Sequence, residues 1–320
     1  MNTHPQTLLG AIRYFSNPDV CQDFMVSLRW PGGTVRCPTC DRDDVRYIAT
    51  RRLWECKDKH AKRQFSVKVG TIFEDSPIAL DKWLATIWMI ANAKNGVSSY
   101  EIHRSIGVTQ KTAWFMLHRI RLAMQSESFD KLSGEVEVDE TFVGGRMRFI
   151  HKHRIERLRK KSFNPNVNKT AVMGLLERHG PDGHSHVRTA VVKTTRRTAL
   201  EPLVRKHVVE GSEVFTDALP SYSDLSDRYV HEFIDHSESY VRGKVHTNGL
   251  ENFWSLLKRA IKGTYVSVEP VHLFRYLDEE VFRFNARKTV DADRFERVTG
   301  AVVGKRLTYH QLIGANTRPA

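Results

Sequence analysis

Four residues near the start of the chain have the spacing of a metal site, and this feature constrains the fold more than any other. Cys37 and Cys40 form a CxxC pair, and Cys56 and His60 follow as a Cys-x3-His pair, with fifteen residues between the two pairs. Thiolate and imidazole groups are donors that close a tetrahedron around Zn²⁺. The segment is short and polar, so a metal would replace the core that it cannot form. We therefore predict a zinc ribbon with structural Zn²⁺ on these four residues.

The CxxC motif has two other interpretations, and one of them remains open. A thioredoxin-like redox site would need a strand–helix–strand context, which this segment lacks. The second pair departs from a second CxxC motif, so His60 could be unrelated to two solvent-near cysteines. Cys21 lies on a predicted N-terminal helix and is expected to pack in a core rather than to bind metal. Residues 1–75 are thus predicted to form an N-terminal helix and a zinc ribbon.

Net charge points to a polyanionic partner. The 320 residues contain 50 Lys and Arg against 37 Asp and Glu, a net charge of +13, and 40% of them are hydrophobic, enough to build cores. Double-stranded DNA is the simplest partner for such a chain. No apolar run approaches the roughly 20 residues of a membrane span. Residues 1–15 lack the pattern of a signal peptide, so we expect a cytoplasmic protein with no membrane partner.

Residues 76–130 have the pattern of a helix-turn-helix module. A core helix precedes two amphipathic helices, and these two are joined by a turn containing Gly107. An ordinary three-helix bundle with a solvated basic side is the alternative. The second amphipathic helix has an apolar stripe of Ala113, Met116, Leu117, Ile120 and Met124. Its other face is predicted to contact DNA in the major groove through Lys111, Trp114, His118 and Arg121.

Residues 131–290 alternate strands and helices in the order βββαβαβα, which is the order of a ribonuclease-H-like core. In the first strand, Val136 and Val138 alternate with Asp139, so the carboxylate is expected on the opposite face. The fourth strand ends in Asp217. In a core of this type the end of the fourth strand lies beside the middle of the first. We therefore expect Asp217 to lie close to Asp139.

The last helix of this region supplies further polar groups. Leu250, Phe253, Trp254, Leu257 and Ile261 form its apolar stripe. Asn248, Glu251 and Lys258 fall on another face, with Lys258 two turns above Glu251. Carboxylates brought together from two strands and a helix make an oxygen-rich site for Mg²⁺ or Mn²⁺. Each acid has a simpler interpretation, as a solvated strand residue or a helix cap. Together, in this element order, they predict a two-metal site for phosphoryl transfer with Lys258 holding a phosphate.

The combined motifs resemble the bacterial insertion-sequence transposases that have an N-terminal zinc ribbon and an ISXO-type DDE domain. The resemblance covers roughly residues 20–290. It rests on CPTC, WEC, FSVKVGTIFEDSPI, GVTQKTAWFMLHRIR, VEVDETFVGG, FTDALPSY, HTNGLENFWSLLKRAIKGTY and HLFRYLDEEVFRFN. It implies cleavage of element ends and joining of the 3′ ends to target DNA by a two-metal site.

Carried over residue by residue, the resemblance implies roles for particular side chains. It implies that Asp139, Asp217 and Glu251 are the metal ligands and that Lys258 is a further residue of the catalytic site. Asn248 is a rival of Glu251 for the third position, because members of this group can use Asn there, and His246 of the HTN signature is treated as accessory. The resemblance also implies element terminal repeats and target DNA as partners, and a homodimer or larger synaptic complex.

Two segments remain outside these motifs. Residues 146–161 contain eight Lys or Arg and one Glu, and such a run is often only a solvated loop. Beside an active site it would add phosphate contacts, for which Arg146, Arg148, Lys152 and Arg154 are the candidates. The C-terminal tail, residues 291–320, contains no readable chemistry. The predicted fold class is therefore an α+β multidomain chain, in which 131–290 is the catalytic domain.

Three functions are consistent with this organisation. A transposase is the leading hypothesis. A ribonuclease-H-like nuclease would cut DNA without joining it. A DNA-binding regulator derived from a transposase would retain the DNA-binding modules while its acids are no longer catalytic.

Overall fold

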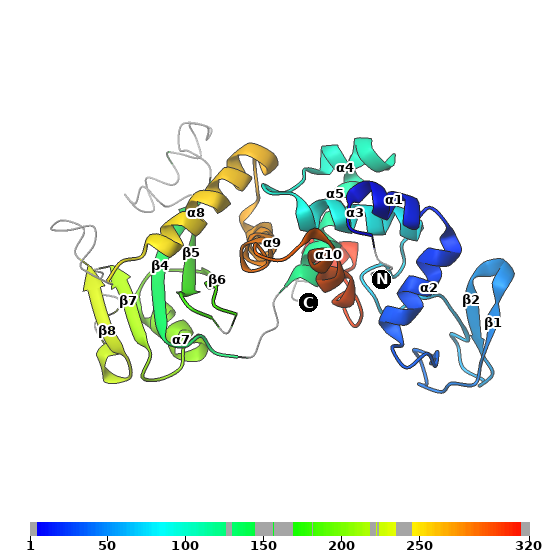
Figure 1. The fold of residues 1–320 in the computed structure, drawn as a ribbon, viewed down its shortest axis with the longest axis horizontal. Helices are drawn as coiled ribbons and strands as arrows, with labels where there is room; N and C mark the ends of the chain where they lie inside the picture. The colour runs from blue at the N-terminus through cyan, green and yellow to red at the C-terminus, as the bar shows by residue number, and fades with distance from the viewer. Residues whose placement is uncertain are drawn as a thin grey trace. The chain divides into compact units, whose positions relative to one another are not determined.

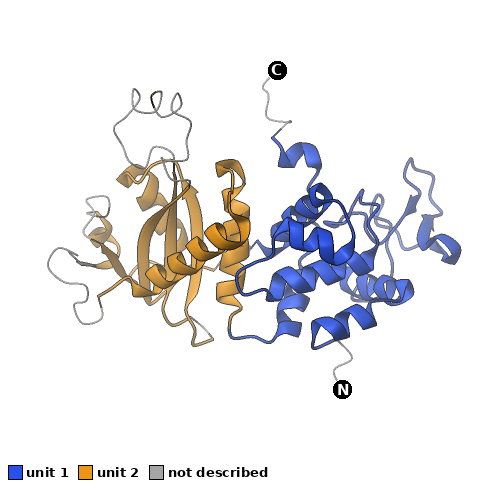
Figure 2. Ribbon diagram, turned by 90° about the horizontal axis from the view of Figure 1, so that it is seen from above, with its two compact units in different colours: residues 1–125, 288–320 blue, residues 126–287 orange. Residues whose placement is uncertain are grey.

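The computed structural model describes residues 5–125, 130–144, 156, 169–180, 182–217, 222, 224–234 and 245–314. The chain divides into two compact units (Figure 2). One unit contains residues 1–125 and 288–320, and the other contains residues 126–287. The C-terminal tail thus belongs to the same unit as the N-terminal modules.

The first unit combines a small sheet with a group of helices (Figure 1). Its elements in chain order are α1 (Leu8–Tyr14), α2 (Pro18–Arg29), β1 (Val45–Ile48), η1 (Ala49–Arg51), β2 (Leu53–Cys56), β3 (Gln64–Phe65), α3 (Leu80–Asn92), α4 (Ser99–Ile106), α5 (Gln110–Met124), α10 (Asp291–Gly300) and α11 (Tyr309–Leu312). Strands β1, β2 and β3 form an antiparallel sheet in that order.

The predicted single N-terminal helix is two helices in the structure. Asn17 caps the start of α2 by accepting a hydrogen bond from the Asp19 backbone N–H, and Pro18 occupies the first turn. A proline is tolerated there but not in a helix interior, so the chain ends α1 and begins α2 at this point. Phe15 and Phe24 of this region pack against Phe295, with ring centroids 5.8 and 5.9 Å from it.

The two amphipathic helices are joined by a turn at Gly107, as predicted. Ser98 and Glu101 form a capping box at the start of α4, which ends at Gly107 with a left-handed backbone (φ 64°). Thr109 caps α5 by accepting from the Thr112 backbone N–H at 3.1 Å. The apolar stripe predicted for α5 is buried throughout. Local capping chemistry therefore fixes both helices and the turn between them.

The second unit contains a five-stranded sheet. Its elements are β4 (Glu135–Val143), β5 (Thr170–Glu177), β6 (His186–Val192), α7 (Arg197–His207), β7 (Glu213–Asp217), η4 (Leu225–Asp227), β8 (Val230–Ile234), α8 (Asn248–Ala260), η5 (Ile261–Tyr265, a π-helical turn), η6 (Pro270–His272) and α9 (Leu273–Asn285). The strand order is β6-β5-β4-β7-β8. Strands β4, β5 and β6 pair antiparallel, and β7 and β8 run parallel to β4.

Helices cover both faces of this sheet (Figure 1). Val136 and Val138 of β4 pack in one apolar cluster with Leu200 and Val204 of α7. A second cluster on the other face joins β5 and β6 to the buried stripe of α8 and to α9. The predicted alternation along β4 is confirmed, because Asp139 lies on the α8 face and the two valines lie on the α7 face. Asp139 therefore lies on the face of the sheet that α8 covers.

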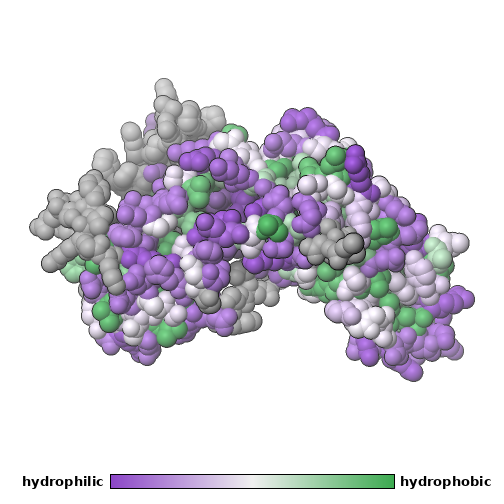
Figure 3. Space-filling view, in the orientation of Figure 1, coloured by the Kyte–Doolittle hydropathy of each residue, from purple (hydrophilic) through white to green (hydrophobic). Residues whose placement is uncertain are grey.

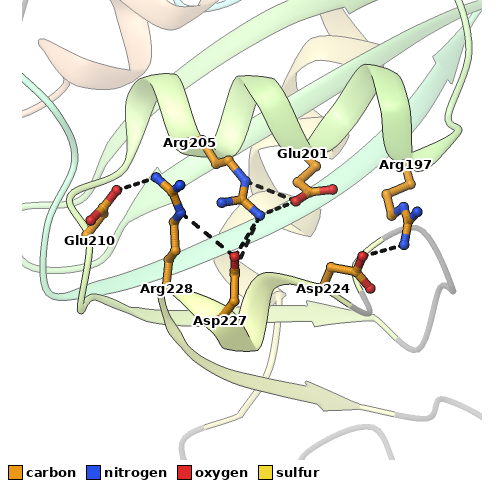
Figure 4. A network of polar contacts seen from close by, with 7 residues as sticks. All are labelled: Arg197, Glu201, Arg205, Glu210, Asp224, Asp227 and Arg228. Atoms are coloured by element: carbon orange, nitrogen blue, oxygen red, sulfur yellow. Dashed lines mark hydrogen bonds and ion pairs between the residues drawn. The ribbon is translucent and has the colours of Figure 1, made fainter.

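A network of ion pairs connects α7 to the segment that follows β7 (Figure 4). Arg205 of α7 contacts Glu201 and Asp227, and Arg228 lies 2.7 Å from Glu210. Asp227, Arg228 and Glu210 are about half exposed, whereas Arg205 and Glu201 are partly buried. Exposed pairs such as Arg228–Glu210 contribute only about 0–1 kcal/mol each.

The visible surface is mostly hydrophilic (Figure 3). In the space-filling view, hydrophilic side chains cover most of the visible face and apolar residues form small separate patches (Figure 3). None of the helices in the described ranges has both the length and the hydropathy that crossing a bilayer requires.

Candidate active site and metal centre

The four predicted zinc ligands converge at the edge of the small sheet. The Cys37 Sγ lies 3.4 Å from the His60 Nε2, and the Cys40 Sγ lies 3.6 Å from the Cys56 Sγ and 3.8 Å from the His60 Nε2. A tetrahedral zinc with bonds of about 2.3 Å to sulfur and about 2.0–2.1 Å to nitrogen requires ligand separations of about 3.6–3.8 Å. The donor set therefore fits Zn²⁺, and His60 belongs to it.

The rest of the ribbon supports this centre. Cys37 and Cys56 are buried, and Trp54 of β2 packs between Trp30 and Phe65, with ring centroids 5.6 and 5.9 Å away. Cys21 lies elsewhere, buried on α2, and its thiol donates to the Phe15 carbonyl at 3.1 Å. Within the described residues, the Cys3His group is the one set that brings three or more such donor atoms within 4.8 Å of one another.

The two predicted aspartates lie side by side on adjacent strands. Strand β7 pairs with β4 in a register that sets Phe215 opposite Glu137. Two residues further along each strand are Asp217 and Asp139, so both face the α8 side of the sheet. Their mutual repulsion contributes to the raised pKa of Asp139. The predicted proximity is therefore present in the structure.

Helix α8 brings two further predicted residues to Asp139. A groove of about 580 Å³ is lined by Asp139, Glu140, Thr141, Glu251, Trp254, Ser255, Lys258, Arg259 and Lys262. Glu251 and Lys258 are thus on the groove side of α8, as their spacing predicted. Asn248 is exposed and is not among the lining residues. Asp217 is not among them either, but its charge acts on Asp139. The carboxylates of Asp139, Asp217 and Glu251 share this region without the close donor separations of the zinc centre.

Burial and neighbouring charges perturb the acids of the groove. The pKa of Asp139 is raised to about 6, mainly by burial. The Asp217 and Glu251 carboxylates also raise it, and the hydrogen bonds from Trp254 and Glu140 act in the opposite direction. Burial also raises the pKa of Glu140 to about 8, again with contributions from Asp217 and Asp139. Acidic groups that are buried next to one another favour a bound cation, because the cation offsets both the burial cost and the repulsion.

Trp254 is a site residue that the sequence analysis placed only in the apolar stripe. Its indole Nε1 donates to the Asp139 Oδ2 at 2.8 Å, while the Glu140 backbone N–H donates to the Asp139 Oδ1 at 2.8 Å. The signal available in the sequence was weak, since a buried tryptophan usually finds a partner for its N–H but the partner is not specified. Glu140 was also missed, and its carboxylate accepts from the Tyr222 hydroxyl.

Replacing Trp254 by phenylalanine should weaken the site without removing a carboxylate. We expect Trp254→Phe to cost about 10–100-fold in metal affinity or activity, the usual effect of losing an outer partner of a ligand. Titration of the purified chain with Mn²⁺ measures the first quantity directly. Trp88→Phe, which removes a buried indole from the other unit, should leave the titration unchanged. Equal curves for the two variants would contradict the role of the indole.

A glycine opposite Asp139 makes room for this tryptophan. Gly174 of β5 pairs with Asp139, and a Cβ built on it would lie 2.6 Å from the Trp254 Cζ2. We expect Gly174→Ala to destabilise the fold by about 1–3 kcal/mol through overpacking, measured by urea unfolding. Gly300→Ala, where a Cβ would meet nothing within 4 Å, is the control. An unchanged midpoint for Gly174→Ala would show that the indole can move away.

The start of α8 is anchored to the sheet by a buried acid. The Glu137 carboxylate accepts from the Leu250 backbone N–H and from the Arg178 Nε, each at 2.9 Å. Arg178 also donates to the His246 carbonyl at 2.7 Å. A Cβ on Gly249 would lie 2.9 Å from the Glu137 Oε2, so the close approach requires glycine there. A carboxylate at a helix N-terminus is favourable. This carboxylate holds the first turn of α8, which contains Glu251, against the sheet.

The prediction that His118 and Arg121 contact DNA is wrong. His118 and Arg121 of α5 are 0% and 1% exposed, so neither can reach a DNA groove. The helix has a wider buried face than its apolar stripe suggested, because the first unit packs against it from more than one side. Lys111 is exposed, and its Nζ lies 4.9 Å from the centroid of the Tyr309 ring. Trp114 is half-buried. Arg146, Arg148, Lys152 and Arg154 lie outside the described residues.

Comparison with known proteins identifies the zinc ribbon and the catalytic domain. Residues 131–285 match the ISXO2-like transposase domain, and residues 16–60 match the transposase zinc-ribbon domain, a match that ends at His60. A protein of Halobacterium salinarum, described as an uncharacterized protein in transposable element ISH50, is 28% identical over 258 residues, which cover 78% of this chain and 84% of that protein.

A second relative comes from Haemophilus influenzae and is described as an uncharacterized transposase-like protein. It is 33% identical over 100 residues, which cover 31% of this chain and 80% of that protein. The matches confirm the predicted resemblance for the zinc ribbon and for the catalytic domain. The chain belongs to the family of ISXO2-like insertion-sequence transposases that have an N-terminal zinc ribbon.

Proposed function

We propose that this transposase cleaves DNA at the ends of an insertion sequence and joins the 3′ ends to target DNA, with a ribonuclease-H-like second unit as the catalytic domain. One observation carries the proposal. Asp139 and Asp217 lie on adjacent strands and face α8, and α8 brings Glu251 and Lys258 to the groove that Asp139 lines. The strand order with three antiparallel strands followed by two parallel ones supports the ribonuclease-H-like assignment.

Asp139, Asp217 and Glu251 would hold Mg²⁺ or Mn²⁺. Their oxygen donors suit these hard cations, and the raised pKa of Asp139 fits a site built to have its charge compensated. Such ions activate a water or a 3′-hydroxyl and stabilise the leaving oxygen of an in-line displacement. The protein side chains orient the ligands: Trp254 fixes the Asp139 carboxylate, and Glu137 fixes the first turn of α8.

The position of Glu251 supports it over Asn248 as the third ligand. Glu251 lines the groove and its charge acts on Asp139, whereas Asn248 lies one turn earlier and outside the lining. Lys258, about two turns along α8, would bind a phosphate of the DNA strand. Arg259 and Lys262 extend the cationic end of the same groove.

The first unit would position the DNA. The pair α4 and α5 has the capped two-helix form of a helix-turn-helix, and Lys111 and Trp114 are the remaining candidates on α5 for contacts with DNA. A basic surface supplies most of the affinity of such proteins and makes it salt-dependent. Joining two element ends to one target would require a homodimer or a larger synaptic complex.

A strand-transfer assay tests the proposed function. Purified chain is mixed with a pre-nicked element-end duplex, Mg²⁺ and a target plasmid, and joined products are resolved on a gel. Joined products are the expected result. Cleavage without joining would favour a nuclease, and binding without either step would favour a DNA-binding regulator.

A further inference from the structure

The cationic end of the groove continues from α8 into the π-helical turn η5. Lys258, Arg259 and Lys262 line the groove that also contains Asp139 and Glu251. All three cations are exposed, and none of their side chains forms an ion pair with a residue in the described part of the chain. Their charge is therefore available to a ligand in the groove.

Lys262 is aligned with the residues already assigned to the site. Glu251, Lys258 and Lys262 are seven and four residues apart, so they follow one side of the helix. At about 1.5 Å of rise per residue, Lys262 lies about 6 Å beyond Lys258 along the axis. Successive nucleotides of one DNA strand rise by about 3.4 Å, so the two ammonium groups can reach neighbouring phosphates of the same strand.

The turn that presents Lys262 is fixed by buried groups of α9. The Tyr265 hydroxyl donates to the Glu279 carboxylate, which also accepts from Arg283. Glu279 is 0% exposed, and Arg283 is bound by Glu280 as well. The Tyr265 ring packs edge-on against Tyr276, with centroids 4.7 Å apart. Tyr265 is thus held in place by hydrogen bonds and by packing.

The backbone of this turn is strained. Residues Ile261–Tyr265 form a π-helical turn, and Val266 after it has a φ of 62°, which is rare for a β-branched residue. Strain of this kind persists only where the surrounding structure enforces it, and π-helical turns recur at functional sites. The buried cluster of Glu279, Glu280 and Arg283 supplies that enforcement through Tyr265.

We propose that Lys262, held in place by Tyr265 and the Glu279–Arg283 pair, binds a second phosphate of the DNA strand whose neighbouring phosphate Lys258 binds. The inference rests on the proposed function, since it extends the DNA contact of the same groove. Lys262 is a DNA-binding residue in this arrangement, and Tyr265 is a positioning residue that acts through it.

The salt dependence of DNA binding tests the contact of Lys262. The probe is a fluorescein-labelled duplex of one element end, with Ca²⁺ in place of Mg²⁺, titrated with full-length chain at about 50–200 mM salt. Loss of one phosphate contact lowers the slope of log K against log salt by about 0.9, so Lys262→Ala should show this decrease and Lys262→Arg should not. Lys206→Ala, an exposed lysine on α7 across the sheet, is the matched control.

A double-mutant cycle tests the positioning role of Tyr265. Tyr265→Phe removes the hydroxyl that reaches Glu279 and should weaken DNA binding in the wild-type background. It should have no further effect on binding when Lys262→Ala is already present, because its contribution passes through Lys262. A purely structural role would weaken binding equally in both backgrounds and would overturn this assignment.

The contact itself would be overturned by one result. If Lys262→Ala leaves the salt slope at the wild-type value, as Lys206→Ala does, Lys262 binds no phosphate. Failure of the proposed function is seen separately, as absence of joined products from the wild-type chain with Mg²⁺ and a target plasmid. The two readouts therefore distinguish a wrong contact from a wrong activity.

Discussion

Asp139→Asn is expected to lower the rate of strand transfer by at least about 10³-fold. A metal ion contributes several kcal/mol of transition-state stabilisation, and each 1.4 kcal/mol is a factor of ten in rate. The amide has the same shape as the carboxylate but lacks the negative charge that holds a divalent cation. The rate of joined-product formation with a pre-nicked duplex and Mg²⁺ measures the effect. Asp217→Asn should behave in the same way.

DNA binding and folding separate this loss from general damage. The pKa of Asp139 is raised by burial and by two neighbouring carboxylates, so removal of its charge should not lower the melting temperature. Affinity for an element-end duplex should stay near the wild-type value, because Asp139 makes no phosphate contact in the proposed site. Asp182→Asn, an exposed carboxylate of the same unit, should leave the rate unchanged. Activity retained by Asp139→Asn would show that the site assignment is wrong.

Much of the second unit could be predicted because its signals are local. Alternation along β4 identified the face of Asp139, and the apolar stripe of α8 left Glu251 and Lys258 on the groove side. In the first unit, the turn at Gly107 between α4 and α5 was predicted in the same way. Each of these features depends on residues a few positions apart, where periodicity and hydrogen-bond chemistry act directly.

The features that sequence reasoning missed depend on distant residues. The hydrogen bond from Trp254 to Asp139 requires a glycine, Gly174, on the neighbouring strand β5. No local sequence pattern indicates that Gly174 pairs with Asp139. Burial of His118 and Arg121 follows from packing within the first unit, which includes residues far along the chain such as Phe295. A charged residue on a helix is usually exposed, so its burial could be found only from the assembled fold.

The last prediction concerns His60, the zinc ligand with the weakest sequence support. We expect His60→Ala to lower zinc affinity by more than the roughly 10–100-fold that loss of an outer-shell partner costs, because a donor bond itself is removed. Structural zinc contributes about 10–16 kcal/mol of apparent binding free energy to small domains, which is also folding free energy. The ribbon around Cys37, Cys40 and Cys56 should therefore lose its structure at low free zinc.

Zinc content and proteolysis measure this outcome. The wild-type chain should retain one zinc per chain after dialysis against a weak chelator, whereas the His60→Ala chain should lose it and be cleaved between the two metal-binding pairs. Cys21→Ala is the control, since Cys21 bonds the Phe15 carbonyl and not the metal group. Because the metal centre and the groove belong to separate compact units, Mn²⁺ binding at Asp139 should persist in the His60→Ala chain. Full zinc retention by that variant would mean that three cysteines hold the metal with another group, and the Cys3His assignment would be wrong.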